Sequence, residues 1–244
     1  MRYLIKNSKR IVFQIMNIGG NNMVNIDDYM HRLQLVLQQV FGNRLLYLGL
    51  QGSYRRGEET PTSDIDAMVI LDYFTIQDMD LYRKTVTNLT PEEQTCGFIC
   101  GKQELLHWNP GEICQLIHET KDYYGNLKDF VPEYTLQDVK NHIKVNVGNL
   151  YHGLCHEFIH FSQGVEKEQL QFAYKSIFYL LQNLHFIRTG KFILKKQDLA
   201  SYLEGLDLQV LQTAESVKIK EFNGQHAFQL LFGWCQQVLH TIDC

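Results

Sequence analysis

Proline is scarce in this sequence of 244 residues, and its four copies all fall between positions 61 and 132. Proline disrupts the interior of a helix because it has no backbone N–H to donate. Its absence from the last 112 residues therefore predicts a helical second half.

Long apolar runs are missing as well, since no segment approaches the ~18 apolar residues of a membrane-spanning helix. The apolar stretch 11–18 is interrupted by Gln14 and Asn17, and no small-residue cleavage site of a secretory signal follows it. We therefore expect no membrane partner, a cytoplasmic location, and six cysteines in the reduced form.

An excess of basic residues is also missing. The chain has 23 Lys and Arg against 27 Asp and Glu, which argues against nucleic acid as a partner. Residues 23–127 are the acidic part, with 8 basic and 15 acidic residues. An acidic segment suits metal ions and cationic small molecules better than polyanions.

Hydrophobic periodicity predicts an α+β first half and an all-helical second half. The first half has expected helices at 26–41 and 76–88, and expected strands at 45–53, 64–71, 96–105 and 112–121. From Thr135 onward the period is that of helices, with one apolar stripe over 143–161, a second over 170–187, and further helices near 196–204, 207–217 and 225–241.

The segment GSYRRGEETPTSDID, residues 52–66, carries the strongest chemical signal. Gly52 lets the backbone approach a bound group closely, and the Ser53 hydroxyl can bond a phosphate oxygen. Asp64 and Asp66 open the next strand, where the side-chain period of 2 directs both carboxylates to one face. Two such close carboxylates repel each other unless a cation lies between them, and Mg²⁺ prefers these oxygen ligands.

This stretch resembles the signature of the polymerase β-like nucleotidyltransferases, in its Gly-Ser pair, the pair Arg56-Gly57, and Ser63-Asp64-x-Asp66 before an apolar strand. The helical half is similar to that of the small-molecule branch, which includes the aminoglycoside (kanamycin-type) nucleotidyltransferases that act in antibiotic resistance. The resemblance implies a catalytic domain over 23–130, a helical bundle domain over 131–244 and, in many relatives, a homodimer.

The implied reaction transfers a nucleoside monophosphate, AMP from ATP, to a hydroxyl of a small cationic acceptor such as an aminoglycoside, with release of pyrophosphate. Asp64 and Asp66 would hold two Mg²⁺ ions. Gly52, Ser53, Arg56 and Ser63 would bind the nucleotide. The alternatives are an antitoxin-like protein adenylyltransferase and a nucleotide-binding sensor of the same fold.

Three further residues are candidates for the same site. The resemblance implies a third metal carboxylate on a neighbouring strand; Glu119 is our choice over Glu104, because it would lie in the middle of the expected strand 112–121. Glu157, on the apolar stripe of its helix, is the candidate general base. Lys175 either reaches a triphosphate in the interdomain cleft or extends into solvent.

Two zinc patterns compete weakly with this interpretation. His156-Glu157-x-x-His160 matches a zinc protease motif, and His152 adds an imidazole on the same helix face, but three ligands on one straight helix cannot surround a tetrahedral ion. We expect a polar face there that lines the cleft. Cys96, Cys100, Cys114 and His118 form the other pattern, for which small core residues are the simpler interpretation.

Residues 1–22 carry four basic and no acidic residues and have no counterpart in the family pattern. We predict that they are an N-terminal extension whose deletion leaves folding intact.

Overall fold

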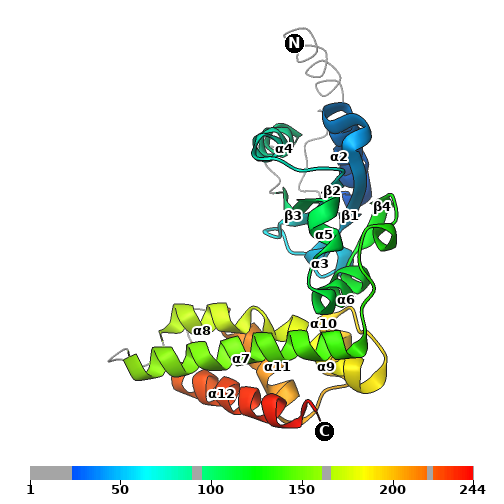
Figure 1. The fold of residues 1–244 in the computed structure, drawn as a ribbon. Helices are drawn as coiled ribbons and strands as arrows, with labels where there is room; N and C mark the ends of the chain where they lie inside the picture. The colour runs from blue at the N-terminus through cyan, green and yellow to red at the C-terminus, as the bar shows by residue number, and fades with distance from the viewer. Residues whose placement is uncertain (1–23, 90–94, 161–165, 219–221, 244) are drawn as a thin grey trace.

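The computed structural model describes residues 24–89, 95–160, 166–218 and 222–243. A four-stranded sheet with its helices forms the first part of the chain, and helices alone form the second (Figure 1). The first part contains α2 (Ile26–Phe41), η1 (Gly42–Arg44), β1 (Leu45–Leu50), α3 (Gly52–Arg56), β2 (Ile65–Leu71), α4 (Ile76–Leu89), β3 (Thr95–Gly101), α5 (Lys102–Leu106), α6 (Pro110–Glu119), β4 (Lys121–Tyr124) and η2 (Leu127–Asp129).

The sheet has the strand order β3-β2-β1-β4 and is mixed. The central strand β1 pairs antiparallel with β2 and with β4, whereas β2 and β3 are parallel and are connected through α4. One face of β2, with Ile65, Ala67 and Val69, packs with residues of α2 and α4. Met68 and Ile70 on the other face pack with residues of α5 and α6. The sheet is thus flanked by helices on both faces, as predicted.

One predicted strand is wrong, because residues 112–121 are mostly helix α6. The Asn109 side chain accepts a hydrogen bond from the Gly111 backbone N–H at 3.0 Å, and Pro110 occupies the first helical turn. This is a strong helix start, since an Asn cap satisfies a free N–H and proline there loses no helical hydrogen bond. The expected strand 96–105 also ends early, and Glu104 lies in the helix α5.

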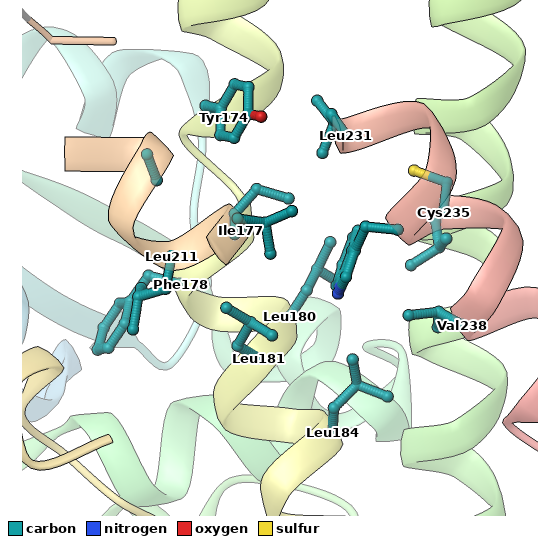
Figure 2. Close-up of a cluster of buried hydrophobic side chains, with 14 of the residues drawn as sticks. Tyr174, Ile177, Phe178, Leu180, Leu181, Leu184, Leu211, Leu231, Cys235 and Val238 are labelled. Carbon is teal, nitrogen blue, oxygen red and sulfur yellow. The ribbon is translucent and has the colours of Figure 1, made fainter. Parts of the chain in front are cut away.

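The second part consists of α7 (Leu136–His160), α8 (Lys167–Tyr174), α9 (Ile177–Thr189), α10 (Lys196–Ala200), α11 (Gly205–Ser216) and α12 (Gly224–Thr241). Its core brings together side chains of α8, α9, α11 and α12 (Figure 2). Trp234 is fully buried there, and its Nε1 donates to Asp207 at 2.7 Å, so the buried indole N–H is satisfied.

The stripe over 170–187, expected to be one helix, is divided between α8 and α9 at Lys175 and Ser176. The described ranges hold no helix long and apolar enough to cross a membrane. The domain limits 23–130 and 131–244 stay predictions, and residues 1–22 lie outside the described residues.

Candidate active site

The segment 52–66 begins where β1 ends and returns as β2, so its two ends lie together. The Gln51 backbone N–H donates to the Asp66 carbonyl at 2.8 Å, and Gly52 follows with φ of +68°. A Cβ at Gly52 would overlap the Asp66 carboxylate, so the backbone passes directly against that group. Only glycine combines this conformation with this approach.

Asp64 and Asp66 are the carboxylates of this site. Asp64 is exposed and Asp66 is half-buried. Burial raises the pKa of Asp66, the negative charge of Asp64 raises it further, and the positive charge of Arg56 opposes both. A divalent cation would relieve this repulsion, so the pair fits a Mg²⁺ ion whose remaining ligands are water and substrate phosphates.

Arg56, the last residue of α3, is buried and contacts both parts of the chain. Its Nε lies 2.9 Å from a Glu58 oxygen, and its Nη1 lies 2.9 Å from Glu119 Oε2. The guanidinium also lies over the rings of Phe178 and Tyr179 in α9, 5.2 and 5.9 Å from their centroids. The contacts with Glu119 and with the rings of α9 place the Arg56 side chain at the interface between the sheet part and the helical part. Its predicted contact with a phosphate stays a prediction.

Glu119 is at the carboxyl end of α6, and its two oxygens have different partners. Oε2 accepts from Arg56, and Oε1 accepts from Gln182 Nε2 at 2.6 Å. Burial raises the pKa of Glu119, and the adjacent charge of Arg56 opposes this effect. Glu119 was our choice as third metal ligand because of an expected strand, and that segment is helix α6 instead. Its role as a metal ligand stays a prediction.

Ser53 and Ser63 have separate structural surroundings. The Ser53 carbonyl accepts from the Glu58 backbone N–H at 3.0 Å, which closes the carboxyl end of α3. The Ser63 hydroxyl accepts from the Thr60 N–H at 2.9 Å and stabilises the turn before β2. Their predicted contacts with a nucleotide stay predictions.

Tyr179 of α9 lies beside Arg56, whose guanidinium is 5.9 Å from the ring centroid. The Tyr179 side chain is 39% exposed. Burial raises the pKa of its hydroxyl, Arg56 opposes this, and the charges of Glu119 and Asp66 add to it, so these groups lie within electrostatic reach of one another. Lys175 is exposed between α8 and α9, with its ammonium 5.8 Å from the Phe172 ring centroid, and its predicted triphosphate contact stays a prediction.

The structure adds two residues that the sequence analysis missed, Gln182 and Lys196. Gln182 is fully buried in α9 at the interface. The Lys196 backbone N–H donates to Glu58 at 2.7 Å, and its ammonium lies 5.4 Å from the Phe178 ring centroid. The polar pair Gln182-Asn183 interrupts the otherwise apolar run 177–184, which was a usable signal for the first residue. The Lys195-Lys196 pair gave little signal for the second.

Glu157 is not brought together with Asp64 and Asp66. Helix α7 contacts α6 near its start, where Gly111 packs against Asp138 and His142. Glu157 is 15 residues beyond His142, or ~22 Å along the helix axis. Figure 1 shows α7 extending from beneath α6 to the opposite end of the helical layer. The predicted role of Glu157 as general base therefore has no support from the geometry.

The residues of the two zinc patterns do not converge on a metal site. The rings of His152, His156 and His160 follow one another along α7, with centroids 6.4 and 4.8 Å apart, on the part of the helix that is remote from α6. The geometry therefore gives no support to the expectation that this face lines the cleft. Across the described ranges no three His, Cys, Asp or Glu residues are placed to hold a metal ion. Burial raises the pKa of Cys114 to about 11.

Comparison with known proteins identifies the domain and the fold. Residues 38–110 match the model of the nucleotidyltransferase domain, which includes β1, α3 and β2. The spectinomycin adenyltransferase of Enterococcus faecialis, solved with ATP and spectinomycin, has 16% identity and a TM-score of 0.57, and the match covers 88% of this chain and 99% of that one. At this identity the likeness shows a shared fold.

A solved toxin–antitoxin with AMP-PNP matches more weakly, with 15% identity, coverage of 50% of this chain and 95% of that one, and a TM-score of 0.35. That score is too low to bear on the fold. No curated protein matches the sequence.

Proposed function

We propose that this chain, whose residues 38–110 form a nucleotidyltransferase domain, transfers AMP from ATP to a hydroxyl of a small cationic acceptor. The observation that carries the proposal is the close approach of Gly52 to Asp66, with Asp64 beside it. A carboxylate pair beside a glycine turn can bind a cation and a triphosphate together, which is the arrangement that nucleotidyl transfer needs.

Asp64 and Asp66 would hold Mg²⁺ in the active protein, where the ion supplies positive charge that neutralises the phosphates and the developing oxyanion. The chain's own groups do the rest. The backbone at Gly52 and the Ser53 hydroxyl orient the triphosphate, and the turn closed by Ser63 holds Asp64 at the start of β2. Lys175, an exposed cation four residues before Tyr179, would meet the outer phosphates.

The acceptor would enter between Asp64 and the exposed edge of Tyr179. The first part of the chain is acidic, which favours a cationic acceptor over an anionic one. An aromatic ring beside carboxylates suits an aminated ring compound, because it offers both apolar contact and attraction for a cation. The spectinomycin adenyltransferase, which shares the two-part fold, was solved with such an acceptor and with ATP, in support of this choice.

The proposal is tested by Mg²⁺-dependent pyrophosphate release from each of the four NTPs. The acceptor panel holds spectinomycin, aminoglycosides, lincosamides and candidate protein acceptors. We expect release with ATP and one class of aminated small molecule, and a mass increase of the acceptor by one AMP. Modification of a protein acceptor alone would replace our proposal with the antitoxin-like alternative.

The control variants separate the site from the fold. Asp64→Asn and Asp66→Asn are expected to abolish release, since each removes a cation ligand. Asp72→Asn changes an exposed carboxylate just after the other end of β2 and is expected to leave release unchanged. Activity that survives in both site variants would refute the assignment of Asp64 and Asp66.

A further inference from the structure

We infer that Gln182 is a positioning residue: through Glu119 and Arg56 it holds the short helix α3, which begins with Gly52 and Ser53, in place beside Asp66. The inference rests on the proposed function only in treating this place as the active site. The contacts themselves link the helical part of the chain to the catalytic segment.

Gln182 is a fully buried amide whose polar atoms are all engaged. Its Oε1 accepts from Gln115 at 2.9 Å. Its Nε2 donates to Glu119 at 2.6 Å and lies 2.9 and 3.2 Å from the carbonyls of Ile193 and Leu194. One side chain of α9 therefore connects α6 with the segment before α10. A buried amide without these partners would be costly, so its orientation is fixed.

The connection continues from Glu119 to α3 through Arg56. Glu119 and Arg56 have side chains only 6% exposed, and their charge-assisted bond is 2.9 Å long. Glu58 completes a ring, because its two oxygens accept from Arg56 and from the Lys196 backbone N–H. The carboxyl end of α3 is thus bound at two points to residues that the helical part holds.

Helix α3 has only five residues and needs such support, since a helix this short is unstable by itself. Its other end carries the glycine that passes against Asp66. A rotation of α3 would therefore displace Gly52 and Ser53 relative to the carboxylate pair. Gln182 has no exposed surface with which to touch a substrate, so its contribution is made through Glu119 and Arg56.

Hydrogen–deuterium exchange in the full-length protein tests this inference without any reaction. Gln182→Met keeps the side-chain length and removes every hydrogen bond. We expect the protected amides of Gly57 and Glu58 to exchange about tenfold faster, the factor for loss of one hydrogen bond to a charged group. Asn183→Leu is the matched control, because Asn183 is the next residue of α9, is 1% exposed, and has a buried Oδ1 without a hydrogen-bond partner in the described structure.

Faster exchange at α3 in Gln182→Met alone supports the inference. The inference is overturned if the amides of Gly57 and Glu58 exchange at the wild-type rate in Gln182→Met, or if both variants accelerate their exchange equally. If Gln182→Met does not fold, Glu119→Gln breaks one link of the same chain, and unchanged exchange at α3 in that variant overturns the inference equally.

Kinetics provides a second readout wherever the wild type turns over. A positioning role predicts that Gln182→Met lowers kcat by about tenfold with a smaller change in the KM for ATP, whereas Asn183→Leu changes neither. A wild type that is inactive with every acceptor would refute the proposed function and leave the exchange result to decide the role of Gln182.

Discussion

Gly52, the first residue of α3, and Gly57, which follows its last residue, have nearly the same backbone conformation and different surroundings. Gly52 has φ of +68° and lies against Asp66, whereas Gly57 has φ of +66° and open space where a Cβ would be. An alanine at either position would be strained by the left-handed conformation. Only at position 52 would its Cβ also collide with a carboxylate. This difference permits a clean test of the close approach.

We predict that Gly52→Ala lowers nucleotidyl transfer by at least about 100-fold, because the new methyl group displaces Asp66 or α3. Gly57→Ala should keep activity within a few-fold of wild type and cost about 1–2 kcal/mol of folding stability from its conformation alone. Pyrophosphate release and thermal melting of both variants decide the point. Equal loss of activity in the two variants would mean that the approach to Asp66 is unimportant.

Asp66 is the residue at which function and stability oppose each other. Its pKa is raised above the ordinary 3.8 by burial and by Asp64. As pH falls, a carboxyl whose pKa is higher in the folded chain is protonated in the folded state before it is protonated in the unfolded state. The folded protein therefore loses stability as pH rises through that pKa. Below the ordinary carboxyl range both states are protonated, and the penalty disappears.

We therefore predict that Asp66→Asn raises Tm at neutral pH in EDTA while it abolishes transfer. The difference in Tm from wild type should shrink as pH falls through the raised pKa of Asp66 and should vanish below the ordinary value of 3.8. Thermal melts between pH 3.5 and 8 measure it, with Asp72→Asn as the exposed control. A variant less stable than wild type at neutral pH would show that Asp66 has stabilising contacts that outweigh the repulsion.

Among the elements, α6 is a helix that the hydrophobic pattern misjudged as a strand. Residues 112–121 contain apolar side chains at spacings that fit either a strand or a short helix, and the Asn109-Pro110-Gly111 group fits a turn as well as a helix start. Packing decided in favour of the helix, because Gly111 allows close contact with the start of α7 and Ile113 is buried against the sheet.

The cap of α6 is a point at which this helix can be weakened. We predict that Asn109→Ala lowers stability by about 1 kcal/mol, which is a fall in Tm of roughly 2–4 °C for a chain of this size. Asn109→Asp keeps an acceptor for the Gly111 N–H and should cost much less. Denaturant melts of the two variants give the comparison, and equal losses would assign the effect to the contact of Asn109 with His142 instead.

The division between α8 and α9 is a second element-level difference. The apolar spacing over 170–187 continues without interruption across Lys175 and Ser176. The Ser176 hydroxyl donates to the Ala173 carbonyl at 3.2 Å, a local bond that competes with the helical ladder and bends helices. Such a break is invisible in a hydrophobic pattern because it leaves the buried face unchanged.

At the scale of the whole molecule, the proposed active site is shared between two structural parts. Asp64 and Asp66 belong to the first, whereas Tyr179 and Gln182 belong to the second. The helical part has its own core around Trp234. It is therefore expected to fold without the sheet, while the sheet part alone would expose Glu119 and Arg56.

We predict that a fragment of residues 131–244 shows helical circular dichroism and cooperative melting, and that a fragment of residues 23–130 has no transfer activity. Mixing the fragments should restore part of the activity, in proportion to their association. Full activity of the sheet fragment alone would contradict a shared site.

The sequence alone determined the sheet-then-helices order, the helix over 26–41, and the carboxylate pair with its glycine turn, because these depend on local period and on short spacing along the chain. Only the tertiary structure decided that Arg56 and Glu119 form a buried pair, that Gln182 joins them, and that Glu157 lies far away. Such contacts join residues 63 positions apart, in Arg56 to Glu119 and again in Glu119 to Gln182. Their geometry depends on how helices pack against a sheet, which periodicity along one chain does not encode.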